Sequence, residues 1–294
     1  MAPLRLVSLV SVTMLAFAGN SLLCRLALKH TSIDAASFTT LRLISGAGML
    51  WLVVRWQRRK RAVAGPTESA EPALAGNWAS SLTLFVYAAA FSFAYVSMSA
   101  ATGALLLFGA VQVTMIGDGI YRGERLQAMQ LLGLALALAG LVVLMLPGLA
   151  TPSLSASLSM LGAGVAWGVY SLRGRAKSKS TVVDPTAVTA GNFIRAVPMT
   201  LVLSLLMNSR LSLDVHGILF AVASGALASG LGYVIWYQVL PALASTHAAT
   251  VQLSVPVIAA FGGVVFIGEA LTLPMVISSV AILGGIALVL LIKK

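Results

Sequence analysis

The sequence predicts an all-α integral membrane protein of ten transmembrane helices, arranged as two inverted repeats of five helices each. The first observation behind this prediction is composition. The 294-residue chain is 59% hydrophobic and 9% charged, whereas a soluble domain is about 25% charged, so lipid must be the solvent over most of its length. The second is an internal repeat. Segments 123–146 and 268–291 both open on Gly-Glu and share a leucine and a later glycine.

Ten apolar segments have the roughly 20-residue length that a bilayer core requires. They lack the alternation of barrel strands, so helices are the only way to satisfy their backbone groups in lipid. The first segment is interpreted as a retained span and not as a signal peptide, and 57–77 as a flexible loop. In chain order the segments are 4–28, 36–56, 78–98, 101–121, 127–147, 154–173, 186–207, 216–237, 246–267 and 272–292.

The basic residues predict the orientation of these spans. If the N-terminus is cytoplasmic, the loops on the inside hold 14 of the 19 Lys and Arg residues, and the loops on the outside hold 3. This bias follows the positive-inside rule and places both termini in the cytoplasm. It also accounts for the basic run 58–61 without nucleic acid, so we expect no nucleic-acid partner.

The repeat divides the chain into segments 1–150 and 151–294, each with five spans. Because five is odd, the second half enters the membrane from the opposite face. The halves are therefore predicted to be inverted repeats, an arrangement that suits alternating access in secondary transporters.

Several short motifs resemble the EamA type of the drug/metabolite transporter superfamily along essentially the whole chain. They are the alanine-rich starts of the fourth and ninth spans (100–104 and 246–249), Pro256, the two Gly-Glu pairs and Trp167-Gly168. The first half departs from the pattern, with Phe17-Ala18-Gly19-Asn20 in place of Trp-Gly and Val111 in place of a proline. The resemblance implies a metabolite exporter, similar to bacterial amino-acid exporters of the inner membrane.

Aromatic and amide side chains within the spans are the first candidates for a binding site. An aromatic cavity with few polar groups describes a small-molecule pocket. Helix packing and interfacial belts are the alternative explanation for the aromatic residues, and interhelical hydrogen bonding for the amides. The candidates are Tyr95, Trp167, Tyr237, Asn20 and Gln252.

Charged residues within the spans form the second group. Arg42 and Arg195 lie in comparable places of the two halves, and each could meet a substrate carboxylate or bond to carbonyls of neighbouring helices. Arg42 completes the set of predicted substrate-binding residues. Asp118 stands one helical turn before Arg122, which favours an ion pair over a proton relay. Glu124 and Glu269 are interpreted as helix caps.

The sequence predicts transport of small metabolites, chiefly neutral amino acids including aromatic ones, by alternating access. One cysteine and three separated histidines exclude a disulfide framework and a metal cluster. No nucleotide-binding loop or catalytic cluster is present, so we expect no enzyme and no cofactor. The expected partners are a small-molecule substrate and the lipid bilayer, and a monomer is compatible with the sequence. Export of other metabolites or drugs, a membrane enzyme and a permease-like partner subunit stay as alternatives.

Overall fold

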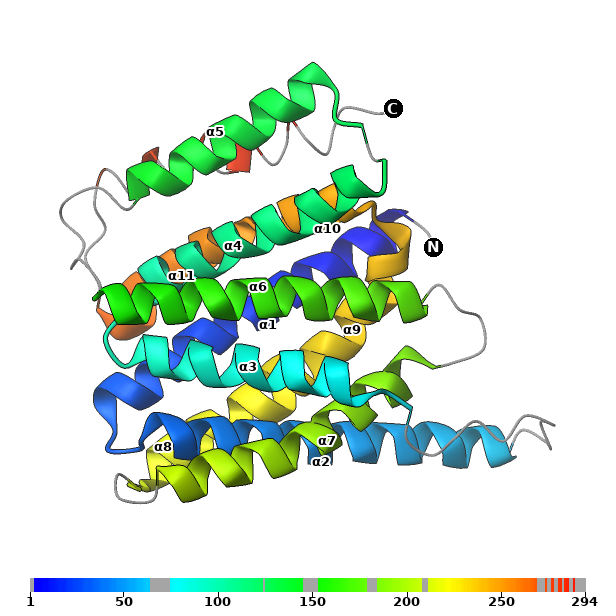
Figure 1. Ribbon diagram of the computed structural model, residues 1–294, viewed down its shortest axis with the longest axis vertical. Helices are drawn as coiled ribbons and strands as arrows, with labels where there is room; N and C mark the ends of the chain where they lie inside the picture. The colour runs from blue at the N-terminus through cyan, green and yellow to red at the C-terminus, as the bar shows by residue number, and fades with distance from the viewer. Residues whose placement is uncertain are drawn as a thin grey trace.

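A computed structural model describes residues 3–63, 75–123, 125–144, 153–178, 184–207 and 211–268, with short pieces of 273–288. Every regular element in these ranges is a helix, and long helices run side by side across the bundle (Figure 1). The elements are α1 (Pro3–His30), α2 (Ala35–Val63), α3 (Trp78–Tyr95), α4 (Ala100–Tyr121), α5 (Ala128–Leu144), α6 (Leu154–Ser178), α7 (Pro185–Leu206), α8 (Val215–Ala223), a π-helix (Ser224–Leu231), α9 (Gly232–Val239), a 3₁₀ turn (Leu240–Ala242), α10 (Ser245–Val251) and α11 (Ser254–Ile267).

Seven candidate membrane spans are found among the described residues, by length and composition. They correspond to the predicted first, second, third, fourth, seventh, eighth and ninth spans, and their ends lie within a few residues of the predicted ones except where α2 and the eighth span run on. The predicted fifth segment forms the shorter apolar helix α5, and the sixth forms α6, which is not among the seven. The predicted tenth segment lies mostly outside the described residues, so the ten-helix count stays a prediction.

Polar residues at the helix starts explain where several spans begin. The side chain of Asn77 accepts a hydrogen bond from the Ser80 backbone at 2.9 Å and caps α3. Ser99, Asp184 and Asp214 cap α4, α7 and α8 in the same way. Such caps satisfy backbone N–H groups that have no partner inside the helix.

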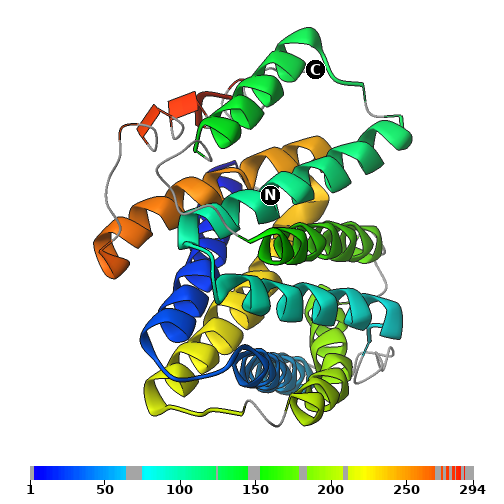
Figure 2. The same cartoon turned by 60° about the vertical axis from the view of Figure 1, so that its left-hand side comes forward.

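The bundle is built from pairs of closely packed helices (Figures 1 and 2). α2 packs along α7, α3 along α6, and α4 along α6 and α11, while α1 crosses α9 and α11. Glycines allow the closest approaches: a Cβ at Gly225 would lie 2.0 Å from the Arg42 carbonyl oxygen, and one at Gly164 would lie 2.3 Å from that of Leu107. Small residues let helix backbones approach in this way.

The eighth and ninth spans are helical, as predicted, but neither is an uninterrupted α-helix. The eighth, Val215–Ala242, changes to a π-helix at Ser224–Leu231 and ends in a 3₁₀ turn. The ninth breaks between α10 and α11, because Pro256 has no N–H to bond the Gln252 carbonyl. That carbonyl accepts from the Val255 N–H instead, at 3.0 Å.

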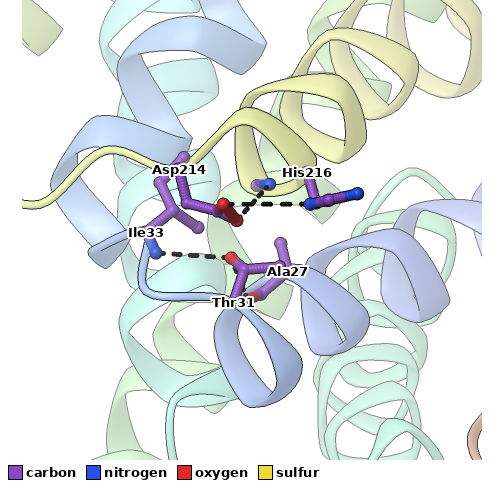
Figure 3. Close-up of polar contacts among 6 residues, drawn as sticks. Ala27, Thr31, Ile33, Asp214 and His216 are labelled. Carbon is purple, nitrogen blue, oxygen red and sulfur yellow. Dashed lines mark hydrogen bonds and ion pairs between the residues drawn. The ribbon is translucent and has the colours of Figure 1, made fainter.

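One end of the bundle is fastened by contacts between distant parts of the chain. Asp34, in the turn between α1 and α2, accepts from the backbone N–H groups of Ala36, Ser37 and Ser212, each at 2.9 Å. Its own N–H donates to the Ser212 carbonyl at 3.2 Å. Beside this contact, the Thr31 hydroxyl accepts from the Ile33 N–H at 3.3 Å, close to the start of α8 (Figure 3). The α1–α2 turn is thereby joined to the α7–α8 loop.

The Asp34 contact predicts a pH-dependent loss of stability. Burial alone would raise the pKa of the Asp34 carboxyl, but hydrogen bonds from Ser212, Ser37 and Ala36 outweigh burial and hold that pKa below its ordinary value. A depressed folded-state pKa stabilises the protein at neutral pH, and this contribution is lost as pH falls below about 4. We expect Asp34→Ala to lower the free energy of unfolding by about 1–2 kcal/mol at pH 7.

Melting temperatures in detergent at pH 7 and at pH 3.5 measure this effect. Asp214→Ala is the control, because it removes the cap of α8 without touching the link to Ser212. The stability gap between wild type and Asp34→Ala should narrow at the lower pH. A gap that is absent at pH 7, or that widens on acidification, would contradict the role of Asp34.

Candidate functional site

A cavity lies inside the bundle, between α1, α3, α4, α6 and α9. Its free volume is about 10 Å³, roughly the space that one water molecule needs and far below the 300–1,000 Å³ of a typical ligand pocket. The protein is therefore closed around this space in the present conformation. The lining residues are Phe17, Asn20, Tyr87, Phe91, Leu107, Phe108, Trp167 and Tyr233.

Trp167 is the centre of the aromatic wall of this cavity. Its ring centroid lies 4.6 Å from that of Tyr233, 5.1 Å from that of Tyr87 and 5.3 Å from that of Phe17, which meets it edge-on. These separations are those of favourable aromatic pairs. Trp167 is 2% exposed, so the wall is part of the protein core.

Arg42 of α2 is buried directly behind the cavity lining. Its Nη2 donates to the hydroxyls of Tyr87 at 2.8 Å and Tyr233 at 3.4 Å, and its Nε donates to Ser229 at 3.2 Å. The guanidinium also lies over the Phe91 ring, 4.9 Å from its centroid. Its Nη1 has no hydrogen-bond partner among the described residues. No carboxylate among the described residues forms a salt bridge with the Arg42 guanidinium.

The π-helix brings two serines to Asn20 and Arg42. Ser224 and Ser229 are five residues apart, which places them near the same face of a π-helix. We assign the Asn20 amide with its oxygen toward Arg42, since the reverse orientation would set N–H groups against the guanidinium. In this orientation Asn20 accepts from Arg42 Nη2 at 3.2 Å and from Ser229 at 3.0 Å, and donates to the Ser224 hydroxyl at 2.6 Å.

Gln252 holds Trp167 from behind and does not line the cavity. Its side-chain oxygen accepts from the Trp167 indole N–H at 3.0 Å, and its amide nitrogen donates to the Ala248 carbonyl at 2.8 Å. The amide therefore links the aromatic wall to the break between α10 and α11. A neighbouring amide, Gln112 of α4, donates in a similar way to the Ala249 carbonyl.

The other two predicted site residues lie away from the cavity. Tyr95 donates to the Ala100 carbonyl at 3.2 Å and packs edge-on against Phe91, with ring centroids 4.7 Å apart. Tyr237 donates to the Tyr170 carbonyl at 3.5 Å, at the end of α9. Of the six predicted residues, the structure thus places Asn20 and Trp167 in the cavity lining and Arg42 and Gln252 directly behind it. These two tyrosines are outside the lining.

Residues that the sequence did not single out complete the cavity. Phe17, in the lining, was noted only as a departure from the family pattern. Ser224 and Ser229 do not line the cavity but bond to Asn20 and Arg42, and they belong to a glycine- and serine-rich run of the kind that packs helices closely. Tyr87 and Phe91 are spaced by four residues, as on one face of a helix, and Tyr233 shares its span with Trp236 and Tyr237, so these aromatic patterns are present in the sequence. The unusual density of glycine and serine in 224–232 was the available signal for a deformed helix.

Arg195 and Asp118 make structural contacts of the kind considered in the sequence analysis. Arg195 donates to the carbonyls of Ala75 and Gly191, each at 2.9 Å. Asp118 pairs with Arg122 at 2.8 Å near the end of α4. Glu124 and Glu269 lie outside the described residues.

Comparison with known proteins defines the class of protein. The model of the EamA-like transporter family matches residues 154–291. An uncharacterized protein of Pseudomonas aeruginosa is 52% identical over 286 residues, which cover 97% of this chain and 94% of that protein. An uncharacterized transporter of Archaeoglobus fulgidus is 26% identical over 259 residues, which cover 86% of each chain. The chain belongs to the EamA-like transporter family, whose members are membrane transporters of small molecules and not enzymes.

A solved structure supports the fold. A protein crystal structure aligns with a TM-score of 0.70 and 21% identity, covering 96% of this chain and 99% of its own. At that identity the likeness concerns the fold alone.

Proposed function

We propose that this protein is a secondary transporter of the inner membrane that exports small metabolites, chiefly neutral amino acids including aromatic ones. The observation that carries the proposal is the closed aromatic cavity with a buried guanidinium behind it. Apolar walls suit a neutral side chain, and the guanidinium offers charge for one anionic group. A single arginine disfavours strongly anionic metabolites.

Alternating access is the proposed mechanism, with segments 1–150 and 151–294 as inverted repeats. Equivalent helix contacts support it. α1 packs on α9 and α11, as α6 packs on α3 and α4; α2 packs on α8, as α7 packs on α3. In both comparisons, a shift of five spans along the chain converts the first set of helix contacts into the second. The 14-to-3 bias of basic residues supports cytoplasmic termini.

Contacts between the two halves of the chain join the bundle near both of its ends. At one end Asp34, before α2, binds Ser212 in the loop before α8. At the other, Asn192 of α7 accepts from the backbone N–H of Asn77 at 3.0 Å, just before α3. We infer that each contact opens in turn, so that the cavity faces one side of the membrane and then the other.

Uptake by proteoliposomes tests the function. Purified protein should catalyse counterflow of labelled phenylalanine and leucine without an imposed pH or sodium gradient, because no described carboxylate lies near the middle of a span. Trp167→Phe should lower the rate severalfold. Trp78→Phe is the matched control, since Trp78 is 60% exposed and lies outside the cavity.

Three results would contradict parts of this proposal. Strict dependence on a gradient would overturn uncoupled transport. Uptake of sugar phosphates without uptake of any neutral amino acid would overturn the substrate class. Transport that requires an added ATPase subunit would replace the secondary transporter with a permease subunit.

A further inference from the structure

The hydrogen bonds of Arg42 leave its charge unmatched. Its acceptors are the hydroxyls of Tyr87, Tyr233 and Ser229 and the amide oxygen of Asn20, all of them neutral groups. Arg42 is 1% exposed. A buried charge normally pairs with an opposite charge, because desolvation is costly and neutral partners compensate only part of it. The four acidic residues within the described ranges all stand at helix ends or in turns: Asp34, Asp118, Asp184 and Asp214.

The donors of this guanidinium are also incompletely used. A guanidinium has five N–H donors, two of them on Nη1, and Nη1 has no partner among the described residues. Nη2 has two hydrogens but three acceptors, of which the Tyr233 hydroxyl is the most distant, at 3.4 Å. The bond to Tyr233 can therefore be exchanged for another acceptor at little cost.

The position of Arg42 connects this unmatched charge to the cavity. Four of the groups that contact its guanidinium, Asn20, Tyr87, Phe91 and Tyr233, also line the cavity. An anion that enters the cavity beside Tyr233 needs only to displace that hydroxyl to reach the guanidinium. The anion would then supply the negative charge that the described part of the protein lacks.

We propose that Arg42 is the anchor for a single carboxylate of the transported molecule, and that this carboxylate is required for recognition. This inference rests on the proposed function and names the substrate group that its site selects. A carboxylate oxygen takes the place of the Tyr233 hydroxyl on Nη2, and the apolar remainder of the substrate lies against Trp167. One guanidinium matches one negative charge, so the site selects monocarboxylates over dianions.

Competition by matched ligands tests the anchor. Counterflow of the labelled amino acid that wild type transports best is challenged with the unlabelled acid, its amide and its deaminated acid. The amide keeps the side chain and amino group but has no carboxylate, and the deaminated acid keeps only the carboxylate and side chain. Both acids should compete, and the amide should compete roughly 10- to 100-fold more weakly, as the loss of a charge-assisted hydrogen bond implies.

Two variants assign the effect to Arg42. The measured quantity is the acid-to-amide ratio, defined as the strength with which the unlabelled acid competes divided by that of its amide. Arg42→Gln should reduce this ratio to near one. Because that variant could also fail to fold, Tyr233→Phe provides a second measurement: it keeps the ring and removes the competing hydroxyl. Its acid-to-amide ratio should equal or exceed that of wild type.

The outcomes separate this inference from the proposed function. If wild type transports amino acids but the amide competes as well as the acid, or if Tyr233→Phe lowers the ratio, the anchor is wrong while transport stands. If wild type transports only solutes without a carboxylate, the anchor is wrong and secondary transport stands. If it transports nothing, the proposed function is wrong, and so is the proposal that Arg42 anchors a substrate carboxylate.

Discussion

Gly225→Ala is expected to prevent the chain from folding into a stable bundle. A Cβ at this position would lie 2.0 Å from the Arg42 carbonyl oxygen and 2.1 Å from the Ser45 hydroxyl. The carbonyl belongs to the backbone of α2 and cannot rotate away, so the π-helix and α2 would have to separate. Overpacking that displaces helix backbones costs about 3 kcal/mol or more. The shift would also move Arg42 relative to Asn20 and Ser229.

Size-exclusion chromatography and melting temperature in detergent measure this loss. Gly48→Ala is the matched control, because Gly48 also lies on α2 and a Cβ there meets no atom within 4 Å. The control should be neutral or stabilising by up to about 1 kcal/mol, since alanine favours a helix over glycine. If Gly225→Ala melts within a degree or two of wild type, the close contact between α2 and the π-helix does not exist in the protein.

Gln252→Leu is expected to lower both stability and transport. Leucine fits the site approximately but leaves the Trp167 indole N–H without its acceptor and the Ala248 carbonyl without its donor. Both groups are buried, and each unsatisfied group costs about 1–3 kcal/mol, so a total of about 2–6 kcal/mol is expected. The Trp167 ring also loses the bond that fixes its orientation, so transport should fall further than the amount of folded protein.

The comparison with Gln112→Leu separates these two effects. Gln112 is buried and donates to the Ala249 carbonyl, one residue from the carbonyl that Gln252 bonds, but it makes no hydrogen bond to Trp167. The Gln112→Leu variant should have a lower stability, while its transport rate per folded molecule stays near that of wild type. In a Trp167→Phe background, Gln252→Leu should have little further effect on the transport rate. Full additivity of the two substitutions would show that Gln252 acts independently of Trp167.

The relation between Gln252 and Trp167 illustrates what sequence reasoning could find at the site. Intramembrane amides and mid-span aromatic residues are costly or uncommon enough to mark both positions as candidates. Their order from the cavity outward, with Trp167 in the wall and Gln252 behind it, depends on how α6 and the α10–α11 region pack against α4. Tyr95 and Tyr237 carry the same sequence signal but bond backbone carbonyls away from the cavity. Aromatic character alone does not distinguish these environments.

The sequence by itself determined the membrane environment, the approximate limits of the spans and the family of this protein. Hydropathy acts over about 20 consecutive residues, and caps such as Asn77 and Asp184 act within one turn, so both are visible in the linear chain. The tertiary structure alone decided that Arg42 meets Tyr87, Tyr233 and Ser229, residues between 45 and 191 positions away. It also decided that 224–231 forms a π-helix against α2. These features depend on the angles and separations at which helices pack, which arise from many side chains together and leave no local pattern.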